Sequence, residues 1–272
     1  MAVYAIGDVQ GCHFSFLDLL QKIKYKPDRD ELIFVGDLVN RGQNSLLFSQ
    51  WCLANQSNIQ TVLGNHDLHL IAIYFDQKKH QKNDTLENLL YSNQIDLFIE
   101  WLIKKPLAIL RDNYLVVHAG IHPTWSINKS LKLADKVHLA LNNDPANFLG
   151  KMYGNQPGYW SDDLKKSLRR RMTINIMTRM RALNFDLSLN YDFKGKIPKT
   201  IDREPYRPWF EFERIDDSIK IITGHWSAIG VHRHSYGISI DSGCVWGQKL
   251  TAFCLESQKT FKVPANPKDL IN

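Results

Sequence analysis

Cysteine is scarce in this sequence, and its spacing matches no common disulfide pattern. The four cysteines are scattered, at Cys12, Cys52, Cys244 and Cys254, and no two of them form a CxxC pair. A small secreted fold held together by disulfides would need a much denser set of cysteines. We therefore expect four reduced thiols in a reducing compartment.

Two kinds of hydrophobic segment are also missing. The N-terminus has no basic region followed by an apolar stretch, as a secretory signal peptide would. No run of about 18 uncharged apolar residues is long enough to cross a bilayer. The first residues, from Ala2 to Ile6, instead have the pattern of a strand. We expect a cytoplasmic protein.

Length and charge limit the remaining possibilities. A chain of 272 residues can bury a full core as one large α/β domain with an insert. There are 34 Lys and Arg residues against 28 Asp and Glu residues, which gives a net charge of +6. This excess suits an anionic partner but does not choose among a nucleotide, RNA and a membrane surface.

Five apolar segments end in a side chain that can bind a metal, usually beside a glycine. A buried strand followed by a glycine lets the backbone turn and approach other groups closely. One such strand end alone is a weak signal, but five in one chain are hard to explain by packing. The five strand-end residues are Asp8, Asp37, Asn65, His118 and His225.

The order of segments predicts an α/β fold. The first 65 residues read β-α-β-α-β, which places parallel strands side by side with their ends aligned. Residues 126–181 are mostly helical, and residues 186–210 hold three prolines and read as a loop. The final third alternates short strands with turns and reads as the second sheet of a sandwich. We expect one domain, 1–272, with a mostly helical insert at about 126–210.

At the strand ends the sequence resembles the metal-dependent phosphoesterases of the calcineurin-like superfamily. The motifs that carry the resemblance are GDVQG, GDLVNRG, GNHD, HAG and GHWS. Further motifs, GNHDLHL at 64–70, TRMR at 178–181 and DSGCVWG at 241–247, are similar to those of its symmetrical diadenosine tetraphosphatase family, over essentially the whole chain. The resemblance implies a two-sheet sandwich flanked by helices.

The resemblance implies a centre with two divalent metal ions. Asp37 would bridge both ions, with Asp8 and Gln10 on the first and Asn65, His118 and His225 on the second. A mixed set of oxygen and nitrogen ligands suits manganese or cobalt, with iron, zinc and magnesium as alternatives.

Other matched residues would contact the substrate. Arg41 would grip phosphate oxygens, although a surface salt bridge is the simpler explanation for an arginine. His66 would act as the general acid, and Asn65 would also touch the substrate. Arg179 and Arg181 would meet a polyphosphate, although a solvated helix face is the simpler reading of this basic segment. Trp226 would lie near the site, although burial in the core explains most tryptophans equally well.

The implied reaction is the symmetrical hydrolysis of diadenosine 5′,5‴-tetraphosphate to two ADP by metal-activated hydroxide. Other dinucleoside polyphosphates and RNA 5′ ends with nucleoside-tetraphosphate caps are further substrates that the resemblance implies, and we expect a monomer. One alternative is a Ser/Thr protein phosphatase of the same superfamily. The other is a non-catalytic nucleotide- or metal-binding module, which the unusual Gln10 motivates.

Asn40 helps to choose between these substrates. It stands where the protein phosphatases of the superfamily carry an acid that charges the catalytic histidine. A serine alkoxide is strongly basic and needs a proton as it leaves, whereas ADP can leave as an anion. We expect the Asn40 side chain to accept a hydrogen bond from His66, without stabilising an imidazolium, and so to favour anhydride hydrolysis.

Overall fold

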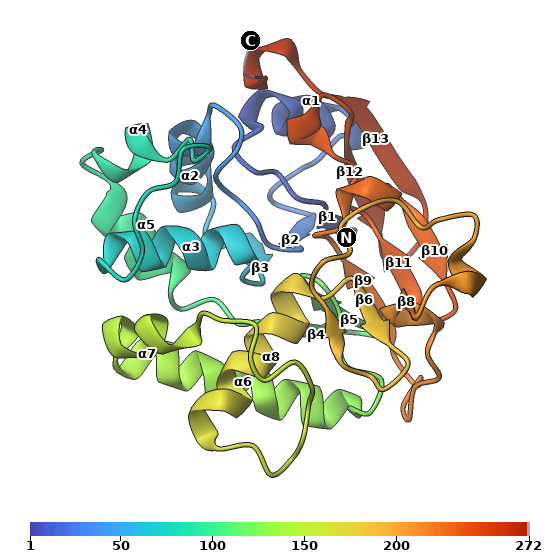
Figure 1. The fold of residues 1–272 in the computed structure, drawn as a ribbon. Coiled ribbons are helices and arrows are strands. Elements are labelled where there is room, and N and C mark those ends of the chain that lie inside the picture. Colours follow the sequence, from blue (N-terminus) through green and yellow to red (C-terminus); the bar gives the residue numbers. More distant parts are fainter. Residues whose placement is uncertain (271–272) are drawn as a thin grey trace.

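The structure is a computed structural model that describes residues 1–270. Two five-stranded sheets form its framework (Figure 1). The first sheet has the order β13-β12-β1-β2-β3 and contains β1 (Val3–Ile6), β2 (Glu31–Phe34), β3 (Ile59–Thr61), β12 (Lys249–Cys254) and β13 (Thr260–Pro264). The second has the order β10-β11-β9-β5-β4 and contains β4 (Ala108–Arg111), β5 (Tyr114–Val117), β9 (Lys220–Thr223), β10 (His232–His234) and β11 (Gly237–Ser239).

The three N-terminal strands are parallel neighbours, as the sequence predicts. Ile6 pairs with Phe34, and Phe34 pairs with Thr61, so the three strands end at the same level of the sheet. Helices α1 (His13–Ile23) and α2 (Ser45–Ala54) connect them. The segments that follow the strands therefore emerge together at one edge.

The two sheets pack face to face. Val3 and Ala5 of β1 and Ile33 of β2 form one buried cluster with Val116 of β5 and Ile222 of β9. The alternate residues of β1 and β2 belong to a larger cluster that contains the helices; they are Tyr4, Ile6, Leu32 and Phe34. Because side chains alternate across a strand, one face meets the other sheet and the opposite face meets helices. This arrangement confirms the predicted two-sheet α/β sandwich.

The prediction for the final third of the chain is wrong in part. Strands β9, β10 and β11 do join the second sheet, but β12 pairs antiparallel with β1 and carries β13 into the first sheet. Five of the six residues of β12 are buried, which fits a strand inside a sheet that is covered on both faces. The order of short strands along the sequence does not reveal which sheet each of them joins.

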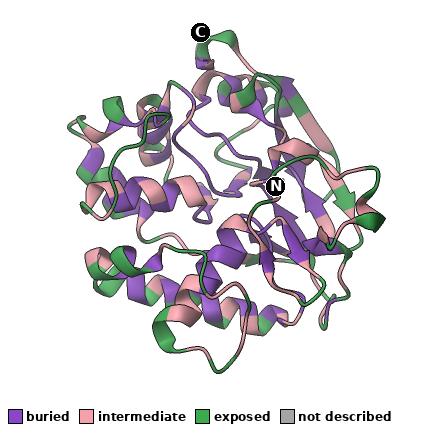
Figure 2. Cartoon of the chain, viewed as in Figure 1, coloured by how far each residue is buried: buried purple, intermediate pink, exposed green. Residues whose placement is uncertain are grey.

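Helices cover the outer faces of the sandwich, and the more exposed residues lie on their outer sides (Figure 2). The remaining α-helices are α3 (Asn65–Tyr74), α4 (Glu87–Leu90), α5 (Ile95–Leu102), α6 (Ile127–Asn143), α7 (Pro145–Met152) and α8 (Lys166–Arg179). Short 3-10 helices are η1 (Ile201–Arg203), η2 (Trp209–Glu211), η3 (Ser227–Ile229), η4 (Cys244–Trp246) and η5 (Pro267–Asp269). Within residues 1–270, no helix is both long enough and apolar enough to cross a membrane.

Residues 126–181 are mostly helical, as predicted, but the segment after them is more ordered than a loop. Strands β6 (Ala182–Asn184), β7 (Leu189–Asn190) and β8 (Tyr206–Pro208) form a small third sheet in the order β7-β6-β8. These strands have only two or three residues each, so they carry no readable alternation of apolar and polar side chains.

His122 fastens this small sheet to the sandwich. Its ring bonds the Thr124 hydroxyl at 2.8 Å through Nδ1 and the Leu187 carbonyl at 3.2 Å through Nε2. The side chain is buried, and burial lowers the pKa of His122 from 6.5 to about 4. A neutral imidazole is therefore part of the folded structure at neutral pH.

This burial predicts an acid-sensitive contribution to stability. The unfolded chain takes up a proton at His122 near pH 6.5, whereas the folded chain does so only near pH 4, so the free energy of unfolding falls as the pH drops between these values. The shift corresponds to about 3 kcal/mol. Urea unfolding at pH 7 and pH 4 should show a smaller loss for His122→Gln than for wild type. The exposed control His80→Gln should follow wild type, and equal losses in all three proteins would contradict this role.

Candidate functional site

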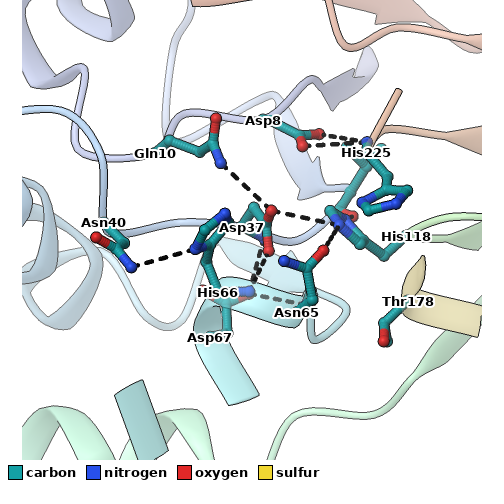
Figure 3. A network of polar contacts seen from close by, with 12 residues as sticks. Asp8, Gln10, Asp37, Asn40, Asn65, His66, Asp67, His118, Thr178 and His225 are labelled. Atoms are coloured by element: carbon teal, nitrogen blue, oxygen red, sulfur yellow. Dashed lines mark hydrogen bonds and ion pairs between the residues drawn. The ribbon is translucent and has the colours of Figure 1, made fainter. Parts of the chain in front are cut away.

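The five strand-end residues meet between the edges of the two sheets. Asp8 and Asp37 follow β1 and β2, Asn65 begins α3 after β3, and His118 and His225 follow β5 and β9 of the second sheet. Figure 3 shows their side chains turned toward one another, with Asp37 at the centre. One ligand atom each from Asp8, Asp37 and His118 lie within 4.8 Å of one another, and all three side chains are buried.

Two glycines allow the backbone to come this close. A Cβ atom on Gly64 would lie 2.1 Å from Asp37 Oδ1, and one on Gly224 would lie 1.9 Å from Asp8 Oδ1. Both distances are impossible for non-bonded atoms, so any side chain at either position would displace a carboxylate. The glycines of GNHD and GHWS thus have the close-approach role that the sequence predicts.

The backbone around the site is held in an unusual conformation. Ten non-glycine residues among residues 1–270 have positive φ, and five of them are Gln10, Asp37, Asn40, Arg41 and His225. Each such residue costs about 1 to 3 kcal/mol and persists only because surrounding contacts enforce it. Half of these strained conformations therefore lie in residues of this one site or next to it.

Asp37 is surrounded by groups that favour its charged form. The backbone N–H of His66 donates to Oδ1 at 2.7 Å, and His118 Nε2 lies 3.4 Å from Oδ2. Burial alone would raise the pKa of Asp37, but the nearby His118 and His66 outweigh it and lower that pKa. The carboxylate is therefore available as an anionic ligand at neutral pH.

Lone-pair atoms converge beside Asp37. His118 Nδ1 bonds the carbonyl of Val35 at 2.8 Å, which leaves Nε2 facing the centre. The Asn65 amide nitrogen lies among acceptors, 2.9 Å from His225 Nδ1, 3.0 Å from the carbonyl oxygen of Thr178 and 3.2 Å from His118 Nε2. The carboxylates of Asp8 and Asp37 and the imidazole of His118 together offer a mixed oxygen and nitrogen ligand set. The residues present thus fit a divalent metal.

Three further carboxyl groups are buried at this centre. Burial, reinforced by neighbouring carboxylates, raises the pKa of Asp67 to about 7 and that of Asp8 well above its ordinary value. Burial also raises the pKa of Asp241 to about 6. Asp67 accepts the backbone N–H groups of Asp37 at 2.8 Å and Leu38 at 2.9 Å, so it holds the turn that presents Asp37.

Asp67 and Asp241 are buried carboxylates of this centre that the sequence did not single out. Both lie in motifs that it recognised, GNHD and DSGCVWG, so their position in the sequence was a usable signal. Asp67 contacts backbone N–H groups instead of facing the cluster of strand-end side chains, so its role depends on contacts that a motif does not show.

The Gln10 side chain lies beside Asp37 and directs its amide nitrogen toward the Asp37 carboxylate. Its Nε2 atom donates to Asp37 Oδ2 at 3.4 Å, so the amide oxygen that could bind a metal points elsewhere. The residue is buried and its backbone has a φ of 46°. Gln10 therefore lies at the centre, as expected of a metal ligand, but its amide oxygen is not turned toward Asp37.

The expectation that Asn40 accepts a hydrogen bond from His66 is wrong. The Asn40 side-chain oxygen already accepts from the backbone N–H groups of Arg41 at 2.8 Å and Thr85 at 3.1 Å. Its nitrogen faces His66 Nδ1 at 3.2 Å and also donates to Asp84 Oδ1 at 2.9 Å. His66 Nδ1 is therefore an acceptor, which leaves the ring proton on Nε2.

Burial and the charge of Arg41 lower the pKa of His66, although Asp37 opposes this. The ring is therefore neutral at neutral pH, with an N–H group at Nε2 that it can donate.

The three arginines lie around the centre in different ways. Arg41 donates from Nη1 to the carbonyl of Asn83 at 2.8 Å. Arg179 bonds the side-chain oxygens of Asn175 and Asn155 at 2.9 and 3.0 Å. Burial lowers the pKa of Arg181, and this effect is opposed by the carboxylates of Asp241, Asp37 and Asp8, which are close enough to interact electrostatically.

Trp226 does not lie where a substrate base could stack on it. Only 3 % of its surface is exposed, and its Nε1 donates to the carbonyl of Gly195 at 2.9 Å. Its ring packs against Phe193 and Phe210. The structure therefore corrects the expectation of a substrate contact, because His225 faces the centre while the next residue enters the core.

Comparisons with known proteins agree with this arrangement. A family model described as calcineurin-like phosphoesterase matches residues 1–176. A protein of Methylobacillus flagellatus named symmetrical bis(5′-nucleosyl)-tetraphosphatase is 42% identical over 99% of this chain and 97% of its own. Proteins with the same name from Chromobacterium violaceum (41% identity; 97% and 95% covered) and Neisseria meningitidis (40%; 97% and 96%) are also similar.

Solved structures share the fold. The crystal structure of a protein assigned as a diadenosine tetraphosphatase covers 98% of this chain and 94% of its own, with a TM-score of 0.66 and 22% identity. A protein serine/threonine phosphatase from Saccharomyces cerevisiae covers 98% and 80%, with a TM-score of 0.54 and 13% identity. At these identities the likeness concerns the fold alone.

The geometry predicts that Asp37 is needed for metal binding. Calorimetric titration with manganese should show two ions bound to wild type and a loss of at least one in Asp37→Asn, because the neutral amide removes the central charge. Asp112→Asn is a matched control, since Asp112 is also an aspartate with positive φ but is exposed and remote. Unchanged manganese binding by folded Asp37→Asn would contradict the assignment.

Proposed function

The chain belongs to the calcineurin-like phosphoesterase family, and we propose that it hydrolyses dinucleoside tetraphosphates symmetrically. Diadenosine 5′,5‴-tetraphosphate would give two ADP. The curated relatives named for this activity match nearly the whole chain, and the motif residues lie together in one centre. The protein is a metal-dependent hydrolase that acts on a small dinucleotide. A protein phosphatase and a non-catalytic binding module are not favoured.

The proposed metal ligands are those that face the centre. Asp37 would be shared by two ions, with Asp8 and Gln10 on one side and Asn65, His118 and His225 on the other; Gln10 would have to turn its amide oxygen toward the ion. When bound, the ions supply positive charge for the phosphate oxygens and make a water molecule more acidic. The mixed oxygen and nitrogen donors favour manganese or cobalt.

The hydrogen bond between Asn40 and His66 is the observation that best supports an anhydride substrate. It leaves His66 neutral, with its proton on Nε2, and a neutral imidazole is a weak acid. A serine alkoxide cannot leave readily without a strong acid, whereas ADP leaves as an anion because its terminal phosphate has a pKa of about 6. His66 then needs only to donate a hydrogen bond to the departing oxygen.

The arginines would hold the phosphate chain. Arg41 and Arg179 border a common cavity that also includes Asn65 and His66, so both guanidinium groups can reach a polyphosphate lying over the centre. Arg181 would also meet the polyphosphate and would help to balance the buried carboxylates that act on its guanidinium group. Planar guanidinium groups suit this task because they bind two phosphate oxygens at once.

We also propose a cellular location, an oligomeric state and further substrates for the protein. It would act as a cytoplasmic monomer built as one domain with an insert at about 126–210. RNA 5′ ends that carry a nucleoside-tetraphosphate cap present the same phosphate chain and would be further substrates.

A direct comparison of substrates tests the proposed function. Purified protein with manganese should convert diadenosine tetraphosphate to ADP without AMP or ATP, and should act much more slowly on a phosphoserine peptide. Removal of the metal with a chelator should abolish the reaction. Faster release of phosphate from the peptide than of ADP from the dinucleotide would contradict the proposal.

Asp84 complicates a simple exchange at position 40. Asn40→Asp alone would place a second carboxylate beside Asp84 Oδ1, now 2.9 Å from the amide nitrogen. The double variant Asn40→Asp/Asp84→Asn exchanges the two groups and keeps the total charge. The new carboxylate at position 40 should raise the pKa of His66 and increase phosphomonoester hydrolysis about tenfold or more relative to the dinucleotide. Asp84→Asn alone is the control, and an unchanged ratio would contradict the role of Asn40.

A further inference from the structure

Arg41 stands between two cavities on the surface. One cavity, of about 340 Å³, includes Arg41, Asn65 and His66 and is therefore part of the metal centre. The other, of about 600 Å³, is also bordered by Arg41 and includes Lys82 and Trp246. Pockets of about 300 to 1,000 Å³ are typical of small-molecule sites. The proposed function uses only the first cavity.

The second cavity presents an exposed aromatic ring. Trp246 is 61 % exposed, whereas Trp125, Trp209 and Trp226 are buried. It ends the short helix η4, which begins three residues after the buried Asp241. Trp246 lies five residues after Asp241 in the DSGCVWG segment, and it borders the second cavity together with Arg41.

The charges around Trp246 suit a phosphate group. Lys82 and Arg41 border the same cavity, and the Arg41 guanidinium is positioned by its bond to the Asn83 carbonyl. Asp84 also borders it, but the two oxygens of its carboxylate accept from Asn40 and bond His69. The cavity thus combines an open aromatic face with two cations, the combination that recognises a nucleotide.

The first cavity has a matching set of groups. Tyr153 lines it and has a buried hydroxyl group without a hydrogen-bond partner. Asn155, Asn175 and Arg179 line the same cavity, so donors and acceptors surround an apolar wall formed in part by Ile174. A base or sugar edge could satisfy the Tyr153 hydroxyl.

We propose that the two cavities each hold one nucleoside of the substrate, with Trp246 stacking on one base and Arg41 holding the tetraphosphate between them. This inference rests on the proposed function. A dinucleoside tetraphosphate has a nucleoside at each end, so two anchoring sites fix the central P–O–P bridge over the centre. The oxygen of a water molecule forms a bond to one central phosphorus, and the bond from that phosphorus to the central bridging oxygen breaks. The bridging oxygen leaves with the second nucleoside diphosphate, and the proton that the water loses passes to solvent. Because the two sites fix the position of the phosphate chain relative to the metal centre, cleavage at the central bridge is symmetrical.

Product binding tests the two sites separately from turnover. The manganese-loaded wild type should bind two ADP molecules per chain in calorimetry, and Trp246→Ala should bind one with unchanged affinity. The control Tyr159→Ala removes another exposed aromatic ring, away from both cavities, and should still bind two. Two ADP molecules bound equally by Trp246→Ala, or only one by wild type, would overturn the proposal.

Kinetics provide a second test. Trp246→Ala should raise KM for diadenosine tetraphosphate about tenfold, or about 1.4 kcal/mol, because the variant loses base stacking on an aromatic ring. It should also release some AMP and ATP, because a substrate anchored at one end can slip. If wild type cleaves no dinucleotide but binds two ADP, the proposed function fails while the two sites stand. Exclusive ADP release with an unchanged KM in the variant would refute the role of Trp246.

Discussion

Four buried carboxylates share one small region of the molecule, and the rest of the site depends on balancing their charge. They are Asp8, Asp37, Asp67 and Asp241. Burial and mutual repulsion raise the pKa of three of them, whereas neighbouring histidines lower that of Asp37. Buried charges of one sign are costly unless cations compensate them. Arg181 supplies part of the compensation, and divalent ions bound at this centre would supply the rest.

The fold brings these groups together by joining two sheets at their strand ends. Parallel strands of the first sheet deliver Asp8 and Asp37, and strands of the second deliver His118 and His225. Gly64 and Gly224 permit contacts that no other residue could make. The positive φ angles at the strand ends cost free energy, which the large sandwich core offsets. The positions of the side chains at the centre thus depend on packing in the core far from it.

The sequence predicted the features that recur as local motifs, and it did not predict the features that depend on residues far apart in the chain. Each strand end carries its own signal, an apolar run followed by a glycine and a polar residue, so Asp37 and His118 could be found. The pairing of β12 with β1 depends on residues about 250 positions apart and left no local pattern. The orientation of Asn40 is set by the backbone N–H of Thr85, which no motif reveals. Trp226 was misplaced because adjacency to His225 does not fix the direction of a side chain.

The central claim is that these strand ends hold two metal ions that share Asp37. Anomalous X-ray diffraction from crystals grown with manganese tests it most directly. The account predicts two anomalous peaks about 3.5 to 4 Å apart, both in direct contact with the Asp37 carboxylate. One peak should lie beside Asp8 and the other among Asn65, His118 and His225. No peak at this position, or a single ion that does not touch Asp37, would contradict the account.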